Sequence, residues 1–165
     1  LRRKPRLIVE CGSGISTLWM ALAIDRFDLP SRIVSLEHEP GFRRQTRELL
    51  ERHGVAHVAD VRDAPLIPAG LDGHDTPWYA RSQTEDLEDI GLLFVDGPPE
   101  TTGALARYPA IPVLSRHFAQ EVTVVLDDLI RQSEREVTKL WQEQLPDFDL
   151  ERVPLEKWAA VFRRA

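Results

Sequence analysis

The sequence is short of two features that would place a protein outside the cytoplasm. It has one cysteine in 165 residues, which excludes an intrachain disulfide framework and a zinc site built from several thiolates. It has no run of the roughly 18 apolar residues that a membrane-spanning helix needs, and the opening residues Leu1 to Pro5 lack the apolar core of a signal peptide. We therefore expect a cytoplasmic protein without a membrane span.

Positive charge is also scarce. The chain has 21 Lys and Arg residues against 27 Asp and Glu residues, which gives a formal net charge of −6. A chain with this balance offers no overall positive field to a phosphate backbone, so nucleic acid is not expected as a partner. The length and a hydrophobic content of 42% suit one compact domain, and we expect residues 1–165 to form it. The chain does not begin with Met, so we expect further residues before Leu1. The sequence gives no indication of the oligomeric state.

Strand-like and helix-like segments alternate along the chain. This alternation predicts an α/β fold with a mostly parallel sheet and helices on both faces. The predicted strands are 7–9, 33–36, 57–59, 92–95 and 122–126; the predicted helices are 17–24, one that begins near Pro40 and stops at Gly54, and one whose buried face includes Ile130, Val137, Leu140 and Trp141.

The end of the chain breaks the alternation. Residues 150–155 and 158–162 look like two strands with a short connection, so we expect an antiparallel hairpin at the edge of the sheet. Trp141 and Trp158 are expected in the core, because both have the spacing of buried residues.

Residues 65–89 form a long segment rich in Pro, Gly, Asp, Thr and Gln. A long connection without regular structure is uncommon in a compact domain unless it has a function, so the segment is a candidate lid over a substrate. Its one bulky pair, Trp78-Tyr79, either covers an aromatic or sugar ring or forms a hydrophobic cluster beneath the loop.

A glycine loop follows the first predicted strand. Gly12 and Gly14 allow a tight turn and a close approach of a ligand, and the following helix offers free N–H groups to an anion. A dinucleotide-binding loop would have a third glycine where Thr17 stands, and Glu10 before the loop would repel a pyrophosphate. The loop therefore favours a cationic ligand with an ammonium and a sulfonium group, although a plain β-α turn would have the same glycines.

A second acidic position follows the second predicted strand. In nucleotide-binding sheets an acid at this position hydrogen-bonds ribose hydroxyls. Glu37 directly follows the apolar residues of the strand and is the preferred candidate. Glu39 is the alternative, although it is also placed to cap the helix that begins near Pro40.

With these residues and the segment Val95-Asp96-Gly97-Pro98-Pro99, the chain resembles class I S-adenosylmethionine-dependent methyltransferases over almost its whole length. It is most similar to a bacterial branch in which that segment is followed by Arg107-Tyr108-Pro109-Ala110, and more distantly similar to catechol-type O-methyltransferases. The resemblance implies a Rossmann-like, seven-stranded sheet with a reversed C-terminal strand.

The resemblance also implies roles for individual residues. Glu10, Gly12 and Gly14 would hold the methionine part of S-adenosylmethionine, Glu37 would hold the ribose, and Asp60 with Val61, placed after the third strand, would lie near the adenine. The remaining residues of the expected cofactor site are Ser13, Ser16, Thr17, His38 and Asp96.

Three aspartates follow the fourth and fifth predicted strands: Asp96, Asp127 and Asp128. In a parallel sheet they would converge where ligands bind, and three oxygen donors could hold Mg²⁺ or another divalent cation. Catechol-type enzymes have an Asp and an Asp-Asn pair as metal ligands there, but the lysine base of those enzymes is replaced here by Pro99. Capping and turn roles for the three aspartates remain open.

The catalytic base is expected to be Asp96, with His38 and His117 as weaker candidates because His38 is more peripheral and His117 precedes its strand. The sequence thus predicts an S-adenosylmethionine-dependent methyltransferase that methylates a hydroxyl of a small molecule or glycan, with or without a divalent cation. A cofactor-binding module without catalysis is one alternative, and a nicotinamide-dependent oxidoreductase is a weaker one.

Overall fold

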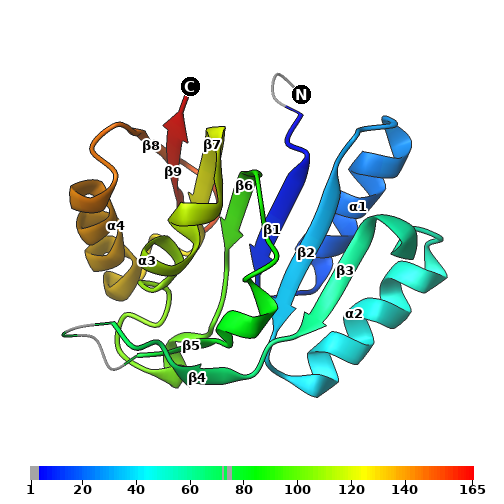
Figure 1. The fold of residues 1–165 in the computed structure, drawn as a ribbon, viewed down its shortest axis with the longest axis horizontal. Helices are drawn as coiled ribbons and strands as arrows, with labels where there is room; N and C mark the ends of the chain where they lie inside the picture. The colour runs from blue at the N-terminus through cyan, green and yellow to red at the C-terminus, as the bar shows by residue number, and fades with distance from the viewer. Residues whose placement is uncertain (1–3, 72, 74–75) are drawn as a thin grey trace.

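The computed structural model describes residues 4–71, 73 and 76–165, and its centre is a seven-stranded sheet with helices on both faces (Figure 1). The strand order is β3-β2-β1-β6-β7-β9-β8. The first five strands in this order are parallel, whereas β9 is antiparallel to both of its neighbours. The predicted sheet with a reversed C-terminal strand is confirmed. Its strands are β1 Leu7–Cys11, β2 Arg32–Glu37, β3 Ala59–Asp63, β6 Ile90–Val95, β7 Phe118–Leu126, β8 Asp149–Val153 and β9 Ala159–Arg164.

Helices cover both faces because apolar side chains alternate along the buried strands. On β1, Ile8 packs against Leu18 and Ile24 of α1, while Leu7 and Val9 belong to the larger core on the other face. No helix within the described ranges is long and apolar enough to cross a membrane. The helices are α1 Ile15–Arg26, α2 Pro40–Arg52, α3 Ala110–Leu114 and α4 Gln132–Gln144, with short 3-10 turns η1 Ala56–Val58, η2 Arg81–Gln83, η3 Glu100–Thr102 and η4 Ser115–His117.

The third strand differs from its prediction. Residues 57 and 58 belong to the turn η1, and β3 begins only at Ala59 and runs to Asp63. β3 is an edge strand, and Val61 is its one fully buried residue in the sequence Ala-Asp-Val-Arg-Asp. The sequence of β3 is mostly polar, so it lacks the run of apolar residues that indicates a strand.

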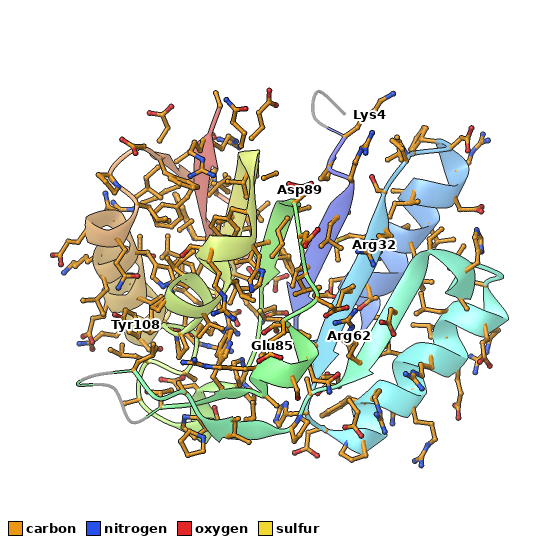
Figure 2. The ribbon with its side chains drawn as sticks, in the orientation of Figure 1. Lys4, Arg32, Arg62, Glu85, Asp89 and Tyr108 are labelled. Carbon is orange, nitrogen blue, oxygen red and sulfur yellow. The ribbon has the colours of Figure 1, made fainter. Side chains whose placement is uncertain are left out.

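The two tryptophans predicted in the core have different surroundings. Trp141 on α4 is fully buried, and its indole N–H donates a 2.9 Å hydrogen bond to the Tyr108 carbonyl; Tyr108 lies against α4 (Figure 2). Trp158 is 45% exposed and lies in the β8–β9 connection with a positive φ of 56°. The prediction for Trp158 is wrong because the turn ends before Ala159 and leaves its side chain outside the strand. Ile130 is also exposed and precedes α4 rather than packing from it.

The segment 65–89, predicted as a lid without regular structure, contains two short strands. Strands β4 Leu66–Pro68 and β5 Pro77–Tyr79 pair as an antiparallel hairpin, which lies along the edge where the arrowheads of β2 and β3 end (Figure 1). Residues 72, 74 and 75 of the predicted lid lie outside the described residues. Trp78 and Tyr79 are buried in the larger core, as the alternative interpretation of a hydrophobic cluster expected.

Candidate active site

A cavity of about 390 Å³ lies at the carboxyl ends of β1, β2 and β6. This is the edge of a parallel sheet at which ligands are expected to bind. Seven of the predicted site residues line it: Glu10, Gly12, Ser13, Ser16, Glu37, His38 and Asp96. The sequence therefore located most of one connected site, although its members are up to 86 positions apart in the chain.

The glycine loop connects β1 to α1 beneath this cavity. Gly12 has a φ of 102°, a conformation that side chains disfavour, and its N–H donates a 3.0 Å hydrogen bond to the Leu36 carbonyl of β2. A Cβ on Gly12 would lie 3.7 Å from the Gly97 nitrogen, so the loop passes close to the end of β6. Gly14 lines a neighbouring cavity with Ser13.

Glu10 is an almost fully buried acid at the floor of the site. Its Oε2 accepts hydrogen bonds from Thr17 at 2.5 Å and from Ser35 at 2.6 Å, and its Oε1 accepts one from Ser16. Burial raises the pKa of Glu10, and these three hydroxyl donors oppose the rise. Thr17 therefore lies behind Glu10 and holds it, rather than lining the cavity itself.

Glu37, at the end of β2, is buried and held from both sides. Its Oε2 accepts a 2.9 Å hydrogen bond from Ser13, and its Oε1 accepts one of 2.9 Å from the Glu39 N–H. His38 Nδ1 lies 3.3 Å from the same Oε1. Glu39 precedes α2, as predicted, but its side chain is 57% exposed and makes no capping hydrogen bond. Glu37 is thus the fixed carboxylate of the pair.

Asp60 and Val61 are not where the sequence interpretation put them. Both lie within β3 rather than after it, and Val61 is buried against α2. Asp60 Oδ2 accepts a 3.0 Å hydrogen bond from Arg62, whose guanidinium also binds both carboxylate oxygens of Asp86; Figure 2 shows Arg62 near the segment that contains Glu85. The boundary error for β3 displaced this prediction, because the last strand residue is Asp63.

The three aspartates do converge, but Arg107 joins them. Its Nη2 donates 3.0 Å hydrogen bonds to Asp96 Oδ1 and to Asp128 Oδ2, and its Nη1 donates one of 3.1 Å to the Asp127 carbonyl. Asp127 Oδ1 accepts the Asp128 N–H at 2.8 Å, as in a local turn. Burial raises the pKa of Asp96, with Arg107 opposing it, whereas the cations around Asp128 lower its pKa despite burial.

The expected metal site does not fit this arrangement. Side-chain cations already bind the carboxylates of Asp96 and Asp128, and no group of three metal-ligating residues is arranged around one point within residues 4–71, 73 and 76–165. Asp127 Oδ1 accepts the backbone N–H of Asp128, its neighbour in the chain. The prediction of Asp96, Asp127 and Asp128 as ligands of one ion is therefore corrected.

The two histidine candidates lie in different places. His38 lines the cavity beside Glu37. His117 lies in η4 directly before β7, at the opposite end of that strand from Asp127, and its Nε2 is 3.0 Å from Arg116 Nε. The expected placement of His117 away from the carboxyl ends is confirmed.

The sequence did not place two residues, Arg107 and Tyr79, in this site. Arg107 was noted only as part of a motif, although three converging acids require a nearby cation. Tyr79 was expected either to cover an aromatic or sugar ring or to form a hydrophobic cluster. It lines the cavity, and its hydroxyl is fully buried with no hydrogen-bond partner among the described residues. Burial raises the pKa of Tyr79 well above the usual value, so the hydroxyl is a proton-bearing donor.

Comparison with known proteins extends these observations. A family model described as a methyltransferase domain matches residues 9–129. No curated protein sequence matches the chain. Solved structures with a similar fold include a methyltransferase from Geobacter sulfurreducens (18% identity, TM-score 0.70, covering 98% of this chain and 72% of that one). The SAH-bound methyltransferase of Podospora anserina (18%, 0.72, 99% and 74%) and an O-methyltransferase of Bacillus cereus in complex with SAH (18%, 0.70, 96% and 74%) are similar too.

Proposed function

The chain belongs to this family of methyltransferase domains and is an S-adenosylmethionine-dependent methyltransferase, and we propose that it methylates a hydroxyl group of a small molecule or a glycan. The observation that carries the proposal is the meeting of Glu10, Gly12 and Glu37 around one cavity at the strand ends. The O-methyltransferase of Bacillus cereus, which has the same fold, supports a hydroxyl acceptor.

The charge of the cavity suits the cofactor. Four acidic residues line it, Glu10, Glu37, Glu39 and Asp96, and a cavity with four carboxyl groups favours a ligand that carries an ammonium and a sulfonium. We propose that the amino-acid end lies against the loop from Glu10 to Gly14, with Ser13 and Ser16 alongside. Glu37 would accept hydrogen bonds from the ribose hydroxyls, with His38 beside it. Asp60 and Val61 are left out of this proposal because they lie away from the cavity.

The orphaned hydroxyl of Tyr79 supports a polar ligand in this cavity. A buried hydroxyl without a partner costs free energy unless a ligand or water pairs with it. Tyr79 lies at the junction of the loop and β6, since its hydroxyl is within 2.7 Å of the position that a Cβ on Gly97 would occupy. A polar ligand group that reached this hydroxyl would satisfy it.

Asp96 is the proposed catalytic base. When bound, S-adenosylmethionine supplies an electrophilic methyl group, and the protein has to align an acceptor oxygen and remove its proton. Asp96 directly follows β6 and lines the cavity, its side chain is 43% exposed, and its pKa is raised, chiefly by burial. A carboxylate with a raised pKa is a better proton acceptor than an ordinary surface aspartate. No step is assigned to a divalent cation, because the expected ligands do not fit one. A cytoplasmic location remains part of the proposal, supported by the single cysteine.

Calorimetric titration tests the cofactor. We expect S-adenosylhomocysteine to give saturable heat and NADH to give none; the reverse result would favour a nicotinamide-dependent oxidoreductase. Incubation with radiolabelled S-adenosylmethionine and pools of phenols, polyols and glycans then tests the reaction. Label on an alkali-stable ether product supports O-methylation, whereas binding without transfer to any pool would favour a module without catalysis.

A further inference from the structure

Arg107 is a buried cation whose two terminal nitrogens bind several acceptors of the site at once. It is 2% exposed, and its Nη2 donates to both the Asp96 carbonyl, at 2.8 Å, and the Asp96 carboxylate, at 3.0 Å. Because it also binds Asp128 and the Asp127 carbonyl, one planar guanidinium ties the end of β6 to the end of β7. A lysine could not make this set of contacts, since its ammonium is a single point rather than a fork.

The acids around Arg107 are balanced by further cations. Asp128 is 3% exposed, and its carboxylate lies 2.9 Å from Arg131 and 3.2 Å from Lys157. Buried Glu134 has its Oε1 3.6 Å from Arg107 Nε. Buried carboxylates are stable only when paired in this way. Three cations, Arg107, Arg131 and Lys157, therefore meet the carboxylates of Asp96, Asp128 and Glu134, and two of the three predicted metal ligands are already paired with side-chain cations.

We propose that the guanidinium of Arg107 takes the place of a divalent metal at this edge of the sheet. It binds the carboxylates that converge there and so positions Asp96 for methyl transfer. The role in methyl transfer rests on the proposed function. To enter, an ion would have to displace a guanidinium that is always charged and that is bound to two backbone carbonyls as well as two carboxylates. Arg107 is thus a positioning residue, since it reaches the cavity only through Asp96.

The contacts with Arg107 leave Asp96 available to an acceptor in the cavity. Arg107 engages Oδ1, while the carboxylate still lines the cavity. Its orientation is fixed by the same guanidinium that fixes the Asp128 carboxylate, so the distance between the ends of β6 and β7 determines where Asp96 points. A divalent ion is the usual means of fixing an acceptor between carboxylates; here the protein offers an oriented carboxylate instead.

Binding of Mn²⁺ tests the charge balance independently of activity. Electron paramagnetic resonance on wild-type protein should show no stoichiometric Mn²⁺ site up to about 1 mM. Arg107→Ala frees two carboxylates, and we expect it to bind Mn²⁺ at least roughly tenfold more tightly and to melt at a higher temperature with Mn²⁺ than without it. Arg47→Ala, which removes an arginine bound to the Val61 carbonyl instead, is the control and should gain no Mn²⁺ affinity.

Turnover tests the positioning role. Dialysis against chelator should change the wild-type rate by less than about twofold, and Arg107→Lys should lower kcat by roughly tenfold with little change in the KM for S-adenosylmethionine. Should Arg107→Ala fail to fold, Arg107→Lys and the chelated wild type still decide the question. A tight Mn²⁺ site in the wild type, or loss of turnover on chelation with recovery on adding Mg²⁺, would overturn the proposal. If the protein did not bind S-adenosylhomocysteine, the proposed function would be contradicted, whereas the conclusion from Mn²⁺ binding would still hold.

Discussion

Thr17 donates a 2.5 Å hydrogen bond to the buried carboxyl group of Glu10. The same hydroxyl accepts the N–H of Gly14 at 2.9 Å, so one side chain ties the start of α1 to the end of β1. Thr17 occupies the position at which a dinucleotide loop has its third glycine. The threonine that departs from the dinucleotide pattern therefore stabilises the loop and holds the carboxyl group of Glu10.

Replacing Thr17 with Val should destabilise the protein by about 1–3 kcal/mol, because it removes a donor from a buried carboxyl group and an acceptor from Gly14. Urea unfolding followed by circular dichroism measures the change. Thr123→Val on β7 is the matched control and should shift stability by no more than about 0.5 kcal/mol. Equal effects of the two variants would mean that the Thr17 hydrogen bonds contribute little.

Glu10→Gln should alter the pH dependence of stability. Because burial raises the folded-state pKa of Glu10, the folded protein binds a proton more readily than the unfolded chain. Its contribution to stability is therefore full below the unfolded pKa of about 4.3 and is lost as pH rises through the raised folded pKa. Over that window wild-type stability should fall relative to the variant.

Urea unfolding of wild type and Glu10→Gln in steps from pH 4 to pH 8 measures this difference. Glu48→Gln, which changes an exposed acid on α2, is the control and should parallel the wild type. The Glu10 variant should also bind S-adenosylhomocysteine at least roughly tenfold more weakly, since it loses the carboxylate that pairs with an ammonium. A wild-type stability that runs parallel to the variant across this range would contradict the prediction.

The pair Glu37 and Glu39 allows a matched test of the ribose contact. Glu37→Gln should weaken S-adenosylhomocysteine binding by about 1.5–3 kcal/mol, the range for hydrogen bonds to charged groups. Glu39→Gln changes an exposed side chain at the same cavity and should have an effect below about 0.5 kcal/mol. Isothermal titration calorimetry gives both values. A larger loss of affinity for Glu39→Gln than for Glu37→Gln would assign the ribose contact to Glu39 instead.

Gly97→Ala should destabilise the protein by about 1–3 kcal/mol through overpacking. The added Cβ would lie 2.7 Å from the Tyr79 hydroxyl and 3.2 Å from the Cys11 carbonyl. Tyr79→Phe removes one of these atoms, so the double variant should recover part of the loss. A double-mutant cycle from thermal melts measures the coupling; strict additivity would show that the two groups do not meet.

The two tryptophans should respond differently to truncation. Trp141→Ala removes a fully buried side chain and should cost about 3–5 kcal/mol. Trp158→Ala removes a half-exposed one and should cost about 1 kcal/mol or less. Chemical unfolding of both variants compares them. A cost for Trp158 close to that for Trp141 would restore the original prediction that it belongs to the core.

Elements with strong local signals could be predicted from the sequence. β1, β2 and β6 are buried on both faces and therefore appear as continuous apolar runs. α2 begins at Pro40 and is followed by Gly54 in a left-handed conformation, as the sequence indicated. β3 was misplaced because an edge strand buries few side chains.

Long-range pairings were harder to predict. The acids at the strand ends could be placed, since parallel strands bring their carboxyl ends together, but nothing in local sequence indicates that Arg107 folds back between them. Tyr79 was missed for a similar reason. It belongs to a short strand in a polar segment, and only the tertiary fold brings its hydroxyl to Gly97.

The insertion of β9 between β7 and β8 also bears on how the protein emerges from the ribosome. β7 is complete at residue 126, but its partner on that side begins only at residue 159. Until then β7 has an unpaired edge, and β8 has no neighbour at all. A nascent chain stalled before Ala159 therefore exposes a strand next to its own active site, and truncation there should yield an aggregating product rather than a shorter enzyme.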